Sequence, residues 1–315
     1  MEFDLNKYFC QCNLVINNSS ILCLILLSDG RFVSGSNDSK IKIYNNNTYI
    51  VEILIEEHSK GVICLIESKI LNFKNLISSS KDSTINIYKI EKNNYKLIQK
   101  IISHSKSVNK IIEISKSTLF NLCSCSDDKT IKLYSLNNNN TEIIYKENFT
   151  FILNEVIFNI IEIKENEIVI STSTNIHKLK FIDLLNKNIK KTINEISIIG
   201  NNSICLIQNK FLIIGGVYAI TIINTNNYSS TIIDCNNSWK IFCILNFNNN
   251  NILFSDDDGT IYQYKIIRDE NNDIIFLDYV ESKICHFNPI YSIIKFDKEK
   301  FITGGNDNII KIWTN

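Results

Sequence analysis

A short strand signature occurs five times in the chain, each time after an aspartate. An isoleucine three residues after the aspartate begins an alternating stretch, and an aromatic residue six positions after the aspartate ends it. The five copies start at Asp38, Asp82, Asp128, Asp258 and Asp307. Turn residues followed by short alternating strands, repeated about every 40 to 50 residues, are typical of the four-stranded blades of a β-propeller. We therefore predict an all-β repeat protein of this architecture.

Other polar residues keep a fixed distance from these aspartates. His58 and His104 each lie 24 residues before the aspartate of their repeat, and His286 lies 21 residues before its own. A hydroxyl side chain stands four residues before four of the aspartates, at Ser34, Ser78, Ser124 and Thr303. Because three of the four histidines follow the repeat, they belong to the repeated unit rather than to a site that is used once.

This set resembles the WD-repeat family. Its blades carry a histidine in the loop before the innermost strand, a Ser or Thr in the second strand, an aspartate in the next turn and a tryptophan closing the third strand. Here the closing aromatic is Tyr in four of the five copies, and Trp313 alone matches the tryptophan. The resemblance implies a structural role for His58, Ser78, Asp82, His104, Ser124, Asp128, His286, Thr303, Asp307 and Trp313.

The repeated histidines and aspartates are interpreted as structural because a catalytic site needs no copies in several blades. Imidazole and carboxylate would hydrogen-bond through the second-strand hydroxyl, so that buried polar groups are paired. We expect no enzyme and no cofactor. A propeller hydrolase of the sialidase kind would need three arginines to clamp a carboxylate, and the chain has two, Arg31 and Arg268.

Two further blades are expected where the spacing persists without the polar residues. Leu153 and Ile199 stand in the histidine place, and Val217 replaces a turn aspartate. Alternating apolar residues in 167–173 and 219–223 support strands there. The count is then seven blades in one domain. Their expected limits are 17–56, 57–102, 103–150, 151–194, 195–234, 235–281 and 282–315.

The last expected blade has three strands of its own, which end at Trp313. Residues 8–16 are strand-like, and we expect them to supply its fourth strand and so close the ring. This pairing would also remove an exposed edge. The alternative is a disordered N-terminal tail.

Composition and charge limit the compartment and the partners. The chain has 315 residues, 44% of them hydrophobic, and a formal net charge of +0. Its apolar stretches are much shorter than the roughly 20 residues that span a bilayer, and its start lacks a signal-peptide core. We expect an intracellular protein, cytoplasmic or nuclear, without a membrane anchor. No overall field draws it to nucleic acid or to anionic lipid.

The ten cysteines are interpreted as core residues and not as a metal site. Four of them share one position of the innermost strand, where a small side chain is needed: Cys23, Cys64, Cys205 and Cys243. The Cys-x-Cys pairs at Cys10 and Cys123 lack the spacing and the nearby histidine of a zinc site. No metal is expected.

The loops before the innermost strands and the turns after the second strands share one face of a propeller, here called the loop face. Such loops on a rigid scaffold carry recognition residues. The predicted partner-binding residues are Lys60, Lys106, Asp127, Trp239, Lys240, Asp256, Asp257, Phe287 and Asn306. Trp239 is predicted to be the aromatic anchor, and the alternative is that it folds under its loop to fill the core.

The favoured function is a non-catalytic scaffold that binds a peptide or protein on the loop face, as a monomeric subunit of a larger complex. The alternative is an RNA-binding or ribonucleoprotein subunit that uses Trp239 and the lysines of the fourth blade. Those lysines are Lys178, Lys180, Lys187, Lys190 and Lys191. They are also explained as edge-strand charges that block sheet-to-sheet pairing.

Overall fold

The fold is known from a computed structural model of the chain. It describes residues 3–15, 19–70, 75–115, 117, 119–139, 142–173, 177–194, 203–216, 219–234, 240–270 and 273–315. The chain divides into two compact units. Unit 1 consists of Met1–Ile21 and Ile196–Asn315, and unit 2 consists of Leu22–Glu195.

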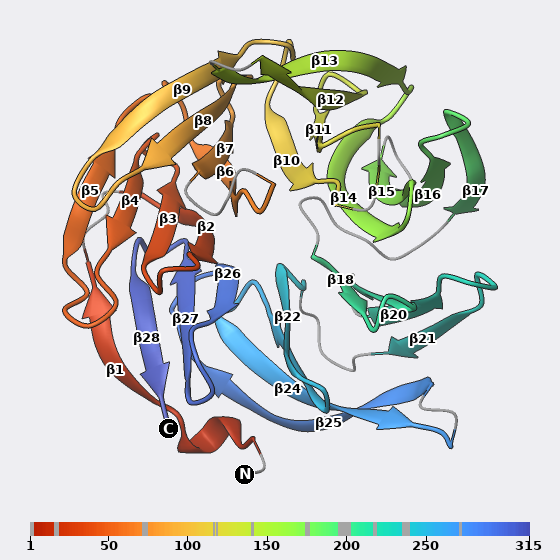
Figure 1. Cartoon of the computed structure of the whole chain (residues 1–315). Helices are drawn as coiled ribbons and strands as arrows, with labels where there is room; N and C mark the ends of the chain where they lie inside the picture. Colours follow the sequence, from red (N-terminus) through yellow and green to blue (C-terminus); the bar gives the residue numbers. More distant parts are fainter. Residues whose placement is uncertain are drawn as a thin grey trace. The chain divides into compact units, whose positions relative to one another are not determined.

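Unit 2 holds four antiparallel sheets of four strands each, in which the strands follow chain order (Figure 1). Blade one is β2 to β5: Ile21–Leu26, Phe32–Ser36, Ile41–Tyr44 and Val51–Ile55. Blade two is β6 to β9: Val62–Glu67, Asn75–Ser80, Ile85–Ile90 and Tyr95–Ile101. Blade three is β10 to β13: Val108–Glu113, Leu122–Ser126, Thr130–Asn139 and Glu142–Ile152. Blade four is β14 to β17: Val156–Lys164, Glu167–Ser173, His177–Asp183 and Asn188–Asn194.

Unit 1 holds three sheets of the same kind. Blade five is β18 to β21: Ile204–Ile207, Phe211–Gly215, Ala219–Asn224 and Ser230–Asp234. Blade six is β22 to β25: Cys243–Asn248, Asn251–Ser255, Thr260–Arg268 and Ile274–Ile284. Blade seven combines β26 to β28, Ile290–Lys295, Lys300–Gly305 and Ile310–Thr314, with β1, Phe9–Leu14. A short 3-10 helix, η1 (Leu5–Lys7), precedes β1.

The strand that completes blade seven comes from the start of the chain, as predicted. β1 runs antiparallel to β28, from Phe9 opposite Thr314 to Leu14 opposite Ile310. Figure 1 shows β1 lying along β28 at the outside of this sheet. The all-β fold of seven four-stranded blades is confirmed as well. The blade limits and the assignment to a single domain stay predictions.

Burial changes along each blade in the way that the sequence pattern indicates. The second strands, such as β3, β7 and β11, are buried along their whole length, because both of their faces are covered. The outer strand β9 alternates between half-buried and exposed residues up to the buried Ile101. This is the pattern of a sheet with one covered face.

Blade one is crowded where its second strand β3 meets the innermost strands β2 and β6, which explains the glycine at position 35. A Cβ atom added at Gly35 would lie 2.6 Å from Cys23 Sγ and 2.9 Å from Val62 Cγ1. All nine cysteines in the described residues are free thiols, four of them buried. Within these residues no helix has the length and hydrophobicity to cross a membrane.

The turns after the second strands use the aspartates of the repeat. The Asp82 Oδ1 atom accepts the N–H of Thr84 at 3.0 Å, which is the side-chain mimic of a backbone turn. The residue between them, Ser83, has a φ of 73°. Asp38, Asp128 and Asp307 bind the N–H two residues later in the same way. The aspartate therefore offsets the cost of the left-handed residue that follows it.

Candidate interaction surface

In blade two the repeated polar residues form one closed set of hydrogen bonds. The Nε2 atom of His58 lies 2.7 Å from Ser78 Oγ, and its Nδ1 atom lies 2.9 Å from Asp82 Oδ2. The Thr84 hydroxyl lies 3.1 Å from His58 Nδ1 and donates to Asp82 Oδ1 at 2.6 Å. The Ser59 N–H also donates to the Asp82 carboxylate, at 2.9 Å. These bonds fix the loop before β6 onto the turn after β7.

Blade three repeats this arrangement. His104 bridges Ser124 Oγ at 2.7 Å and Asp128 Oδ2 at 2.9 Å, and the Thr130 hydroxyl donates to Asp128 Oδ1 at 2.6 Å. The Tyr134 hydroxyl lies 3.1 Å from Ser124 Oγ and takes the place of the tryptophan that the family carries. The polar set thus extends from the loop into the third strand.

Blade seven contains the copy with tryptophan. His286 bridges Thr303 Oγ1 at 2.7 Å and Asp307 Oδ2 at 2.8 Å. The indole N–H of Trp313 donates to the same threonine oxygen at 2.9 Å. The side chains of His58, His104 and His286 are all fully buried. Each set is closed within its blade, so its chemistry is that of a structural tie.

The carboxylates of these sets are stabilised in their charged form. Burial alone would raise the pKa of Asp82, but the hydrogen bonds from His58 and Thr84 outweigh burial. The pKa of Asp82 therefore lies well below its usual range, and that of Asp128 is lowered by the same balance. The pKa of Asp307 is lowered as well, with the bond to His286 opposing burial.

The predicted partner-binding residues differ in accessibility. Those that are exposed are Lys60, Lys106, Lys240, Phe287 and Asn306, and those that are half-buried are Asp127 and Asp257. Trp239, the predicted anchor, lies outside the described residues. Its place as the anchor stays a prediction.

The comparison with protein families agrees with this geometry. A model of the family described as "WD domain, G-beta repeat" matches residues 10–45, 95–135 and 279–314. The chain carries WD40 repeats. The matched segments include β2 to β4 of blade one, β10, β11 and the first part of β12 in blade three, and β26 to β28 of blade seven. No curated protein sequence matches the chain.

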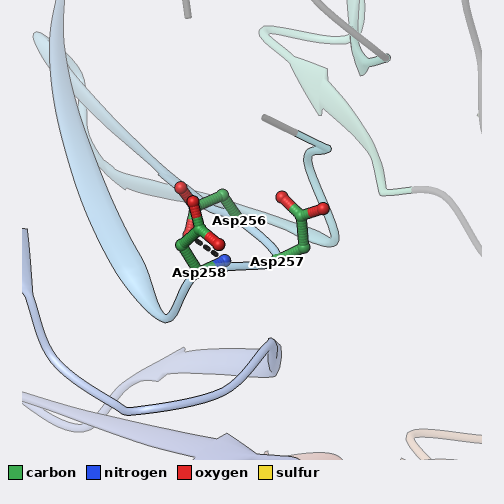
Figure 2. A group of neighbouring side chains, drawn as sticks. All are labelled: Asp256, Asp257 and Asp258. Carbon is green, nitrogen blue, oxygen red and sulfur yellow. Dashed lines mark hydrogen bonds between the residues drawn. The ribbon is translucent and has the colours of Figure 1, made fainter. Parts of the chain in front are cut away.

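In blade six, the burial of Asp256 corrects the prediction that it is an exposed binding residue. Its exposed fraction is 1%, and its carboxylate accepts the N–H groups of Asp258 and Thr260 and the hydroxyl of Tyr262, at 3.0, 2.8 and 3.0 Å. Figure 2 shows the bond from the Asp258 N–H. Burial raises the pKa of Asp256. Asp256 cannot present its charge to a partner, because its carboxylate is buried and already accepts three hydrogen bonds from residues of its own turn and strand.

The reason lies in the register of the repeat. Two residues before the turn aspartate, blades two and three carry Ser80 and Ser126, whose hydroxyls accept the N–H of that aspartate at 3.0 Å. Asp256 takes this place ahead of Asp258 and makes the same bond. The signal was available, because two buried serines of the repeat align with Asp256.

Asp256, Asp257 and Asp258 also form a group that could hold a metal ion. One oxygen from each carboxylate lies within 4.8 Å of the others. However, Asp256 already binds the turn, and Asp257 Oδ1 accepts the N–H of Lys240 at 3.0 Å. These bonds account for the positions of two of the three carboxylates. The cluster by itself is therefore no ground for a metal site.

One set of residues was not predicted: glutamates at or near the ends of the innermost strands β6, β10 and β14. The carboxylate of Glu67 accepts both the N–H and the hydroxyl of Ser28 in the preceding blade, each at 2.8 Å. Glu162 accepts the N–H and the hydroxyl of Ser115, at 3.1 and 3.0 Å. Glu113 accepts the N–H of Lys69 at 2.8 Å. These glutamate clasps join blades one to four in series.

A sequence signal for the clasps exists. Each glutamate follows an aliphatic residue and an isoleucine, in 65–67, 111–113 and 160–162. In unit 1 the equivalent position of blade seven is Lys295. Its ammonium group donates to the carbonyl of Phe247 in blade six at 2.8 Å. The same joint between blades is thus made with the opposite charge.

Proposed function

We propose that this chain is a non-catalytic, intracellular scaffold that binds a peptide or protein partner at the loops of unit 1 around Phe287. Propellers built from WD40 repeats generally act as protein-interaction scaffolds, and the chain carries such repeats. In the proposal the whole chain acts as one propeller domain and as a monomeric subunit of a larger complex. The histidine sets hold the loops in place.

The observation that carries the proposal is the exposure of Phe287. Its exposed fraction is 87%, the largest of the exposed large hydrophobic side chains in the described residues. Ile284 nearby is 75% exposed. The Lys311 ammonium group lies 5.8 Å from the centre of the Phe287 ring and donates to the carbonyl of Cys285 at 2.7 Å. An exposed aromatic side chain beside a cation fits an interface anchor.

The loop that carries Phe287 is tied to the turn of blade six through the two residues before Phe287. The N–H groups of Cys285 and His286 donate to the carbonyl of Gly259, at 2.8 and 2.9 Å. Gly259 has a φ of 81°, and a Cβ atom there would lie 2.3 Å from the carbonyl oxygen of His286. Because the backbone is fixed, a partner that binds Phe287 orders little new chain.

The alternative of an RNA-binding subunit is less well supported. Lys180 is paired with Glu155 at 2.5 Å, and Lys190 lies 3.7 Å from Glu167 and 3.6 Å from Asp183. The Lys187 ammonium group lies 4.4 Å from the centre of the Phe149 ring. These cations have partners within the protein, which weakens their attraction for phosphate.

The test is a selection from a displayed library of random twelve-residue peptides against the wild-type protein. The selected peptides are then titrated against Phe287→Ala and against Phe9→Ala. Phe9 is the matched control, because it is an exposed phenylalanine of unit 1 on the outer strand β1. We expect Phe287→Ala to weaken binding about 30-fold, the scale of an aromatic hot spot of about 2 kcal/mol.

Equal binding by Phe287→Ala and the wild type would refute this anchor. Equal losses in Phe287→Ala and Phe9→Ala would point to non-specific apolar adhesion. Retention of an RNA oligonucleotide pool that weakens steeply with salt, without any selected peptide, would favour the RNA alternative.

A further inference from the structure

The outer strands of the blades differ in one respect. Six outer strands pair with their neighbours through a shift in register, which marks a β-bulge or a similar irregularity. The shifts lie at Ile43/Tyr44, Ile87/Tyr88, Leu133/Tyr134, Phe181/Ile182, Gln263/Tyr264 and Cys10/Cys12. A bulge interrupts the row of hydrogen-bonding groups and bends the strand, which protects an edge from further pairing.

Blade five is the exception in the described part of the chain. β21 pairs with β20 from Ala219 opposite Asp234 to Ile223 opposite Ser230 without any shift. β21 is also the edge strand of its sheet, and no described strand is hydrogen-bonded to its outer side. It therefore presents a regular edge where the other blades present an interrupted one.

The residues of β21 lack the other common protection of an edge. The strand contains no lysine, whereas the outer strand of blade two carries Lys96 and Lys100 and that of blade four carries Lys190 and Lys191. Ser230, Thr231, Ile232 and Asp234 are exposed, with Ile232 at 63%. Ile233 packs against the core of blades five and six and holds the strand in place. The edge is thus regular, partly apolar and fixed.

We propose that β21 accepts an extended segment of a partner protein as an added fifth strand of blade five. Main-chain hydrogen bonds to the regular edge would supply the affinity. Pockets for every second side chain of the segment would supply the selectivity. The segment would carry an aliphatic residue against Ile232 and a basic residue near Asp234, the single charge of the strand. This inference rests on the scaffold function proposed above but uses a different surface.

A second copy of the chain fits this edge less well. A five-residue strand is about 17 Å long at about 3.4 Å per residue. Antiparallel pairing of two copies centred on Ile232 would bring together one apolar pair. A stable dimer interface buries about 1,200 to 2,000 Å² in total, which so short a ladder does not supply. An extended segment needs only the ladder and one side-chain contact.

The probe is a library of ten-residue peptides in which Val or Ile alternates with Thr or Lys. Binders to the wild-type protein are titrated against Ile232→Lys, which places a charge on the edge. The matched control is Ile98→Lys, on the bulged outer strand β9. We expect at least a tenfold loss of affinity in Ile232→Lys and wild-type affinity in Ile98→Lys and in Phe287→Ala.

A second arm does not depend on any protein variant. Two N-methylated forms of each peptide are made, one methylated at the odd-numbered and one at the even-numbered amides. Methylation removes the N–H donors that would pair with β21, so one of the two forms should bind at least tenfold more weakly. Undiminished binding of both N-methylated forms would overturn the proposal. So would peptides that bind Ile232→Lys as well as the wild type.

The outcome also separates the two proposals. Binders lost in Phe287→Ala but kept in Ile232→Lys would overturn the edge proposal and support the loop surface. Sedimentation measurements at increasing protein concentration test whether a second copy of the chain binds β21 instead. A dimer of the wild type that disappears in Ile232→Lys would assign the edge to a second copy and overturn the partner segment.

Discussion

Blades three and four follow each other in unit 2 and fill equivalent positions with opposite chemistry. In blade three Ser124 lies opposite Lys132, and in blade four Ile170 lies opposite Lys180. Ser124 shares a hydrogen bond with Tyr134 at 3.1 Å. Ile170 instead packs in a fully apolar cluster with Ile182, the residue that takes the tyrosine position.

The charged residues differ in the same way. Lys132 donates to Glu147, a partner one-third exposed, at 2.8 Å. Lys180 pairs at 2.5 Å with Glu155, whose side chain is 8% exposed and which also accepts the Thr172 hydroxyl. A four-stranded blade therefore forms with or without the histidine set. The histidine set ties the loop before the innermost strand to the turn after the second strand. In blade four, which lacks the set, aliphatic packing and a buried ion pair stabilise the sheet instead.

The largest effect is expected from breaking the ion pair of blade four. Lys180→Met should lower the free energy of unfolding by about 3 kcal/mol, because it removes the Lys180 cation from the buried Glu155 carboxylate. Lys132→Met is the control and should cost less than about 1 kcal/mol, since Glu147 can turn to solvent. Urea unfolding measures both.

A double variant sharpens this test. Lys180→Met combined with Glu155→Leu should recover most of the loss, because the buried Glu155 charge is then removed together with that of Lys180. Equal losses for Lys180→Met and Lys132→Met would show that the pair of blade four is no more buried than that of blade three.

The next effect belongs to the polar set of blade three. Asp128→Ala should lower the free energy of unfolding by about 2 kcal/mol, because His104 and Thr130 lose their buried partner. Asp127→Ala is the control one residue away, where the carboxylate is half-buried and accepts a bond from Asn109. The same urea midpoint for both variants would contradict the closed set.

Acid should weaken the polar set of blade three. The pKa of Asp128 is lowered in the folded protein, so its contribution is complete above the unfolded pKa of about 3.9. It is lost as pH falls toward the folded pKa. Wild-type stability should fall by about 1 kcal/mol per pH unit below pH 4 for each such carboxylate.

Asp128→Asn supplies the comparison, because it removes one titrating group from blade three. Its stability should change less steeply with pH below 4 than that of the wild type. Parallel slopes would show that Asp128 does not titrate differently in the folded and unfolded chains.

The smallest effect is expected where blades three and four meet. Glu162→Gln weakens the clasp on Ser115 and should cost about 0.5 to 1 kcal/mol, since the contact is exposed and one charged acceptor is lost. Lys295→Met tests the charge-reversed joint of unit 1 and should cost a similar amount. A loss near 3 kcal/mol in either variant would mean that the joints between blades, rather than the blades, carry the stability.

Repeat spacing predicted the fold because it reports directly on blades. The distance from His58 to Asp82 is a property of one blade, and the two residues meet there. The glutamates of the clasps also recur, but the glutamate alone does not indicate its partner in the preceding blade, so the clasp of Glu67 on Ser28 was not predicted. The ion pair of Lys180 and Glu155 occurs in one blade. Because it is not repeated, it produces no periodic spacing in the sequence from which it could be predicted.

Two other features needed the register of the strands. Asp256 stands in a run of three aspartates, and its burial follows only from aligning that run with Ser80 and Ser126. The regular edge of β21 is seen in its pairing with β20, which has no register shift. The residue composition of the strand does not predict this.

The pairing of β1 with β28 has a consequence for synthesis. Phe9–Leu14 is synthesised about 300 residues before Ile310–Thr314, its partner. At about 5 to 20 residues per second this delay is roughly 15 to 60 seconds. Unit 2 is continuous in sequence and can fold during translation, whereas blade seven must wait until β28 has been made. Until β28 has been made, the hydrogen-bonding groups of β1 stay open to pairing with other strands.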